Sequence, residues 1–166
     1  MVSLDAPRPR VLIVDDDPDT VQTLSRALRR HEQFDVQAAS SMQDALTVLD
    51  GSLPDVVLVD LSMSMVDGHR LLRQVRQAPR TATLPVFVLT GRHEGPVIRA
   101  AAQAGASGFI PQPFNGLEIT YKIDQAIRGS RTRAAEVSDL LRPEPGTSPG
   151  GWSVEDRIAG SLTPIT

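Results

Sequence analysis

The chain has 166 residues, of which 40% are hydrophobic and 22% are charged, so it suits one globular domain with its own core better than two. Its formal net charge of −3 gives no electrostatic reason to expect a nucleic acid partner, and we expect none. The absence of cysteine excludes disulfides and thiolate metal sites. Because no apolar run approaches the roughly 20 residues of a membrane-spanning helix, and the first residues lack the apolar core of a signal peptide, we expect a cytoplasmic protein without a membrane partner.

Short apolar runs alternate with helical patterns along most of the chain. In chain order, the pattern predicts a strand at residues 11–14, a helix at 18–31, a strand at 35–39, a helix at 41–49, a strand at 55–61, a helix at 67–77, a strand at 85–90, a helix at 95–104, a strand at 107–112 and a helix at 115–128. Five strand-helix units of this length predict an α/β fold. We expect a doubly wound, flavodoxin-like three-layer sandwich with a parallel sheet in strand order 2-1-3-4-5 and helices on both faces.

Polar residues follow or end four of the predicted strands: Asp15 with Asp16, then Asp60, Thr90 and Gln112. Sheets of this kind bind ligands at the carboxyl ends of their strands, so these side chains are expected to share one cleft. Three carboxylates in a small cleft repel one another, and a hard cation such as Mg²⁺ is the natural compensation. Mg²⁺ also prefers phosphate oxygens, and a carboxylate is a competent nucleophile toward phosphorus. The sequence therefore predicts Mg²⁺-dependent phosphoryl transfer.

Four segments carry a resemblance to a known family: VLIVDDDPD, DVVLVDLSMSMVDG, VFVLTG and GASGFIPQPF, in this order. Together they resemble the CheY-like receiver domain of two-component response regulators over about residues 10–129. The resemblance implies that Asp60 accepts a phosphoryl group from a sensor histidine kinase or a phosphotransfer protein.

The same resemblance implies a metal site and a switch. Asp16 and the acceptor aspartate would bind Mg²⁺ directly together with the backbone carbonyl of Ser62, and Asp15 would act through water. Thr90 would donate a hydrogen bond to the phosphoryl group and draw Phe109 inward.

The sequence departs from the family at two positions. Gln112 stands where the family has a lysine, and a neutral amide is a weaker hydrogen-bond donor than an ammonium. We therefore expect slower phosphorylation or weaker coupling to Thr90. Arg92 and His93 could supply positive charge in its place. Ser64 replaces a proline that is usual in the loop after the acceptor.

The C-terminal region allows two interpretations. Apolar spacing continues past residue 128 and could extend the last helix, whereas Gly129 and Ser130 favour a break. We divide the chain into an extension at residues 1–9, a receiver at 10–129 and a C-terminal extension at 130–166. The last would hold a helix at 131–141, followed by a linker rich in proline and glycine and a tail.

Three functions compete. The first is a stand-alone response regulator in a two-component phosphorelay, which is not a metabolic enzyme and which contacts a downstream protein target through helix four, strand five and helix five. The second is a degenerate receiver that works as a phosphorylation-independent interaction or dimerisation module, and Gln112 favours it. The third is a phosphatase of the haloacid dehalogenase type using Asp15 and Asp17, which leaves Asp60 unexplained.

Homodimerisation through helix four, strand five and helix five, or through the C-terminal extension, is a further hypothesis. An apolar stripe on the last helix motivates it, although that stripe fits packing on the sheet better: Ile119, Ile123 and Ile127.

Overall fold

The computed structural model describes residues 7–30, 33–63, 65–91 and 95–140. The chain divides into two compact units, Met1–Arg133 and Ala134–Thr166. Ser64, Arg92, His93 and the predicted linker and tail lie outside the described residues. Among the helices that are described, none is long and apolar enough to cross a membrane.

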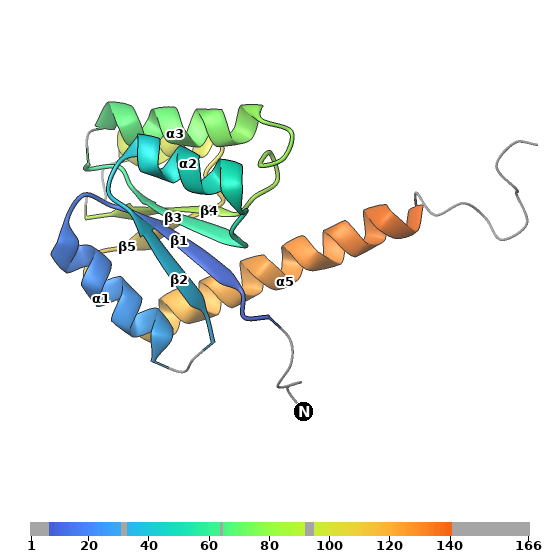
Figure 1. Cartoon of the computed structure of the whole chain (residues 1–166). Coiled ribbons are helices and arrows are strands. Elements are labelled where there is room, and N and C mark those ends of the chain that lie inside the picture. The colour runs from blue at the N-terminus through green and yellow to red at the C-terminus, as the bar shows by residue number, and fades with distance from the viewer. Residues whose placement is uncertain (1–6, 31–32, 64, 92–94, 141–166) are drawn as a thin grey trace, which may run out of the picture. The chain divides into compact units, whose positions relative to one another are not determined.

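The predicted alternation of strands and helices is confirmed (Figure 1). The strands are β1 (Arg10–Val14), β2 (Asp35–Ala39), β3 (Val56–Asp60), β4 (Val86–Thr90) and β5 (Gly108–Pro111). The helices are α1 (Pro18–Arg29), α2 (Met42–Gly51), α3 (Met65–Gln77), α4 (Gly95–Gln103) and α5 (Gly116–Leu140). Apart from the end of α5, each boundary lies within two residues of its predicted place.

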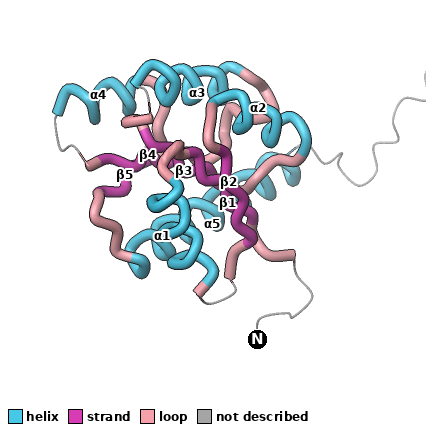
Figure 2. Tube along the Cα trace, turned by 60° about the vertical axis from the view of Figure 1, so that its left-hand side comes forward, coloured by secondary structure: helices cyan, strands magenta, loops and turns pink. Residues whose placement is uncertain are grey.

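The five strands form one parallel sheet in the predicted order β2-β1-β3-β4-β5. Figures 1 and 2 show α2, α3 and α4 on one face of the sheet, and α1 with the first part of α5 on the other. Each face has its own hydrophobic core cluster. Because helices cover both faces, β3 and β4 are buried at every position, which explains why they read as continuous apolar runs.

Local sequence signals fix the helix starts. Asp17 is the N-cap of α1, where its carboxylate accepts hydrogen bonds from the backbone N–H groups of Asp19 and Thr20, and Pro18 occupies the first turn. Ser41 caps α2 in the same way by accepting from the backbone of Asp44. The last residue of the Asp15–Asp17 run therefore has a structural role.

Helix α5 is continuous. It passes through Gly129 and Ser130 without a break, so the first of the two interpretations of the C-terminal region, an extended last helix, is confirmed. Its isoleucine stripe is buried in the core cluster shared with α1 and the sheet, so the stripe offers no surface to a second copy of the chain: Ile119, Ile123 and Ile127. The described side chains after Ser130 are exposed.

Arg76 ties the end of α3 to two loops. Its guanidinium donates hydrogen bonds to the carbonyls of Leu84 (Nη1, 2.6 Å) and Gly105 (Nε, 2.8 Å) and to the hydroxyl of Ser107 (Nη2, 3.1 Å). Gly105 has φ +100°, and a Cβ there would lie 2.8 Å from Cγ of Arg76, so both its conformation and the close approach require glycine. This one side chain therefore connects α3 with the segment that precedes β4 and the segment that precedes β5.

Candidate functional site

The strand register brings three polar side chains to the carboxyl edge of the sheet. Asp60 and Thr90 are the last residues of β3 and β4, and Asp15 directly follows β1. Val14 pairs with Val59, and Asp60 pairs with Leu89, so the three polar residues end adjacent strands at nearly the same level. All three side chains are buried, Asp15 at 1% exposure and the other two at 7%.

The ionised form of Asp15 is unfavourable in the folded protein. Its Oδ1 accepts a hydrogen bond from the backbone N–H of Asp17 at 2.9 Å, but its buried Oδ2 has no partner in the part of the chain that the structure describes. Burial is the main cause that raises the pKa of Asp15 to about 6, and the negative charges of Asp60, Asp16 and Asp17 raise it further. A cation beside Asp15 would relieve both effects.

Asp60 is held by Ser62. The backbone N–H of Ser62 donates to Oδ1 of Asp60 at 2.8 Å, and the Ser62 hydroxyl lies 2.6 Å from Oδ1 and 2.7 Å from Oδ2. The family resemblance implies a role only for the backbone carbonyl of Ser62, so the contact of its hydroxyl with Asp60 was not predicted. The available signal was a serine two residues after a strand-terminal aspartate, because short polar side chains bond neighbouring groups in turns.

Asp16 lies at a hollow next to the buried carboxylates. Unlike Asp15, it is exposed, and both residues line a hollow of about 370 Å³ together with Asp44 and Ser40 from the start of α2. Ser40 donates a hydrogen bond to Asp44 at 3.2 Å. Asp44 is an acidic neighbour of the site that no motif in the sequence indicates.

The donor chemistry at this edge fits Mg²⁺ better than a metal held by protein ligands alone. Among the described residues, no three His, Asp or Glu side chains are arranged to hold a metal ion. Mg²⁺ usually takes only one or two carboxylates and keeps several waters. The unpartnered Oδ2 of Asp15, close to the charge of Asp60, matches that requirement.

Gln112 and Phe109 lie beside Thr90. The backbone N–H of Gln112 donates to the Thr90 carbonyl at 2.9 Å, and its side-chain Oε1 would be 3.2 Å from a Cβ placed on Gly91. Phe109 pairs with Val88, two residues before Thr90, so Phe109 and Thr90 point to the same face of the sheet. The structure thus brings the predicted switch residues and Gln112 to the same end of β4 and β5.

Lys122 on α5 contacts the backbone of β5. Its Nζ donates to the carbonyl of Phe109 at 3.0 Å and forms an ion pair with Glu118 at 2.9 Å. The spacing of Glu118 and Lys122 predicts their ion pair. No local pattern predicts the contact with β5.

The comparisons with known proteins agree with this geometry. Residues 11–124 match the model of the response regulator receiver domain. The chain belongs to the response regulator receiver family.

Relatives of this receiver occur in several bacteria. It is 33% identical over 115 residues to an uncharacterised 14.6 kDa protein of Leptolyngbya boryana, a match that covers 69% of this chain and 87% of that protein. It is 30% identical over 137 residues to the transcriptional regulatory protein PrrA of Mycobacterium tuberculosis, which covers 82% of this chain. The matched part of PrrA is 58% of its length, so this receiver corresponds to a little over half of that relative.

Solved structures share the receiver fold. A structure assigned as a response regulator from Chloroflexus aurantiacus is 33% identical and superposes with a TM-score of 0.67, covering 74% of this chain and 99% of that one. The chemotaxis response regulator CheY4 of Vibrio cholerae is 23% identical with a TM-score of 0.66, covering 72% of this chain and 99% of that one, and supports the fold alone.

Proposed function

We propose that this receiver is a phospho-acceptor switch of a two-component phosphorelay. Asp60 takes a phosphoryl group from a sensor histidine kinase or a phosphotransfer protein. Mg²⁺ would be held directly by Asp16, Asp60 and the carbonyl of Ser62, with Asp15 acting through water. The observation that carries the proposal is the burial of Asp15, Asp60 and Thr90 together at the carboxyl edge of the parallel sheet. Buried ionisable groups gathered at one edge of a sheet are typical of functional sites, and this cluster suits a phosphoryl site.

Each residue of the proposed site has a separate role in phosphoryl transfer. A carboxylate oxygen of Asp60 attacks the phosphorus, and the bond to the donor's histidine nitrogen breaks, leaving the imidazole to take up a proton. The Ser62 hydroxyl has to leave that oxygen before the attack. Bound Mg²⁺ offsets the negative charge of the carboxylates and of the incoming phosphoryl group. Thr90 then donates to the phosphoryl group, and Phe109 moves inward. The chain accepts and loses phosphate but turns over no metabolite.

The proposed output is contact with other proteins. On α5, Leu117 and Tyr121 are 78% and 66% exposed and lie one turn apart, so they are apolar side chains that a downstream protein or a second copy could cover. A stand-alone regulator in the cytoplasm is part of the proposal, and the small L. boryana relative, matched over 87% of its length, supports it. The net charge of −3 favours protein targets over nucleic acid.

A second candidate is a degenerate receiver that binds partners without being phosphorylated. Gln112 favours this reading, because the residue beside Thr90 carries no ammonium to offset the charge of a phosphoryl group. At an effective dielectric near 20, two unit charges about 4 Å apart interact by roughly 4 kcal/mol, which sets an upper guide to the loss.

Intact-protein mass spectrometry with acetyl phosphate, with and without Mg²⁺, separates the two candidates. The variants are the unchanged chain, Asp60→Asn and Gln112→Lys. The proposal predicts a Mg²⁺-dependent phosphoryl adduct on the unchanged chain that disappears in Asp60→Asn. An adduct that forms only in Gln112→Lys would instead establish the degenerate receiver, and an adduct that persists in Asp60→Asn would overturn the assignment of the acceptor.

Homodimerisation is tested by light scattering on the unchanged chain and on Leu117→Ser/Tyr121→Ser. We expect a larger mass for the phosphorylated chain than for the unphosphorylated one, and a monomer for the double variant under both conditions. A monomer for the unchanged chain at high concentration, phosphorylated or not, would exclude the dimer.

A further inference from the structure

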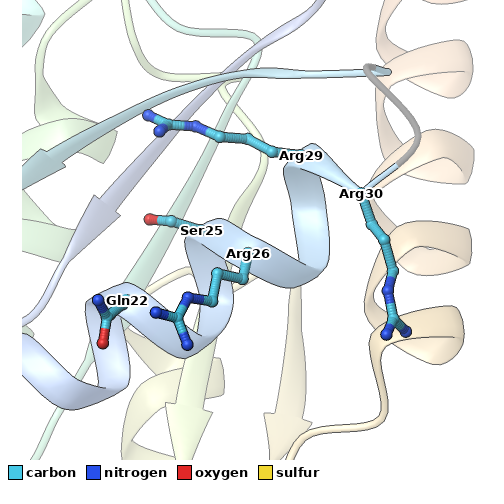
Figure 3. Close-up of a pocket in the computed structure, with 5 residues that line it drawn as sticks. All are labelled: Gln22, Ser25, Arg26, Arg29 and Arg30. Carbon is cyan, nitrogen blue, oxygen red and sulfur yellow. The ribbon is translucent and has the colours of Figure 1, made fainter.

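The amino edge of the sheet, opposite the proposed phosphoryl site, carries a hollow with apolar and charged walls. Its volume is about 160 Å³. We call it the base hollow, and its walls include residues from the segments before β3 and β4 and from α5: Pro54, Asp55, Arg80, Pro85, Ile127 and Arg131. A hollow at the end of α1, in contrast, is lined by polar side chains alone, as Figure 3 shows: Gln22, Ser25, Arg26, Arg29 and Arg30. Of these two hollows, the base hollow suits a ligand with an apolar part.

The base hollow is separate from the proposed phosphoryl site. Asp55 leads into β3 and Pro85 leads into β4, whereas Asp60 and Thr90 end the same strands. Both strands have five residues, which at about 3.3 Å per residue place the two edges roughly 16 Å apart. A small molecule in the base hollow would therefore not touch a phosphoryl group on Asp60.

The floor of the base hollow is apolar. Pro54, Pro85 and Ile127 are buried, and so is Leu84, which also lines the hollow. Each proline ring fixes its own backbone φ, so this floor is preformed. The volume of about 160 Å³ equals about five water molecules at about 30 Å³ each. Pockets for drug-sized ligands begin at about 300 Å³, so the floor suits a short apolar group of about four carbons.

The rim of the base hollow carries two arginines, and Asp55 is the one carboxylate among its lining residues. Oδ2 of Asp55 accepts a hydrogen bond from the backbone N–H of Arg10 at 2.8 Å, which fixes this side chain. Nη2 of Arg131 lies 3.6 Å from Oδ1 of Asp55, an ion-pair distance that is longer than a hydrogen bond. Nη1 of Arg80 donates to the carbonyl of Asp50 at 3.3 Å, and a guanidinium has further N–H groups for a ligand. One positive charge at the rim is therefore in excess.

We propose that the base hollow binds a small monocarboxylic acid with a short apolar tail. The tail would lie on Pro54, Pro85 and Ile127, and the carboxylate would accept hydrogen bonds from the arginines at the rim. A single negative charge balances the excess positive charge. Inorganic phosphate, in contrast, would leave the apolar floor uncovered, and a nucleotide exceeds the volume. The site needs neither Mg²⁺ nor phosphorylation, so it does not depend on the proposed phospho-acceptor function.

A ligand in the base hollow would also stabilise the continuation of α5. Among the described residues, Ile127 is the last buried core residue, and Ser130 and Arg131 follow it in the next turn as part of the hollow's wall. A carboxylate bonded to both arginines would link this turn of α5 to the segment before β4, where Arg80 lies. The bound acid should therefore protect the backbone amides of this turn from hydrogen exchange.

The experiment is an NMR titration of the full, isotope-labelled chain with three matched probes. Isovalerate has both the tail and the charge, isovaleramide has the tail alone, and acetate has the charge without the tail. The proteins are the unchanged chain, Arg80→Gln/Arg131→Gln and the control Arg73→Gln/Arg128→Gln, which removes the same charge from exposed positions of α3 and α5. A further variant, Ser130→Leu, fills the hollow and keeps both of its arginines.

We expect isovalerate to shift the backbone amide signals of Asp55, Leu84 and Ser130 with a Kd on the order of 1 mM. Binding should be about tenfold weaker in Arg80→Gln/Arg131→Gln and within about twofold of the unchanged chain in the control. Isovaleramide and acetate should each bind the unchanged chain about tenfold more weakly than isovalerate does, and Ser130→Leu should show no saturable shift.

Four results would overturn the proposal. The first is the absence of saturable shifts at these amides with isovalerate up to about 20 mM, well above the expected Kd. The second is equal binding of isovaleramide or acetate, which would show that the charge or the tail has no role. The third is an equal loss of binding in both double variants. The fourth is unchanged binding in Ser130→Leu, which decides the question even if the loss of both arginines unfolds the chain.

Discussion

Asp15 is buried beside other carboxylates, and its raised pKa makes stability depend on pH. The pKa rises from 3.8 to about 6 in the folded protein, chiefly through burial. Between these values the unfolded chain releases the Asp15 proton while the folded chain keeps it, so stability falls as pH rises through this window and levels off above it. Asp15→Asn should therefore raise the free energy of unfolding at neutral pH by about 2 kcal/mol.

Urea unfolding at a series of pH values in metal-free buffer measures this effect. Asp16→Asn is the matched control, because Asp16 is exposed. We expect the fall in stability between pH 4 and 6 in the unchanged chain and the control, and a smaller fall in Asp15→Asn. If the free energy of unfolding depended on pH in the same way for all three proteins, the pKa of Asp15 would not be raised in the folded state.

Ser62 occupies both oxygens of the proposed phospho-acceptor. If its hydroxyl has to move before Asp60 reacts, Ser62→Ala should accelerate adduct formation with acetyl phosphate about fivefold, the equivalent of one net hydrogen bond. Ser62→Thr keeps the hydroxyl and is the control. A slower Ser62→Ala variant would mean that the hydroxyl assists the transfer.

At the scale of elements, Arg76 joins α3 to the loops that precede β4 and β5. Arg76→Leu should lower the free energy of unfolding by about 2–4 kcal/mol, because the carbonyls of Leu84 and Gly105 lose their charged donor. Arg73→Leu, on an exposed position of the same helix, should change it by less than about 0.5 kcal/mol. Urea unfolding compares the two variants, and similar losses would show that Arg76 contributes only general helix stability.

The sequence was sufficient for most elements and for the polar edge of the sheet. Buried parallel strands read as apolar runs, and their carboxyl ends converge by topology, so Asp15, Asp60 and Thr90 could be located without coordinates. The continuity of α5 could not be predicted with confidence from Gly129 and Ser130. A single glycine costs about 1 kcal/mol in a helix, which the flanking helix-forming residues can offset.

Contacts between distant parts of the chain could not be predicted from the sequence either. Lys122 meets the carbonyl of Phe109 only because α5 packs back against β5, and the clamp of Arg76 joins residues 29 positions apart. Such bonds depend on side-chain paths that composition and periodicity do not encode.

At the scale of the whole molecule, the buried core of the described residues ends within the first part of α5. Among the residues that the structure describes, the last buried core residue is Ile127, and the side chains of residues 131–136 and 138–140 are exposed. A chain shortened to residues 1–133 should therefore keep its free energy of unfolding within about 0.5 kcal/mol of the full chain, as urea unfolding would measure. A larger loss would show that residues beyond Arg133 stabilise the receiver.

The printed sequence contains a single lysine, Lys122, and its ammonium lies against the backbone of β5. An amine-reactive reagent can therefore modify this chain only at that side chain and at the N-terminal amine. Acylation requires a free, neutral amine, so its rate reports how firmly Phe109 and Glu118 hold Lys122. The native chain thus carries a chemical reporter on the strand of the predicted switch, with no engineered residue.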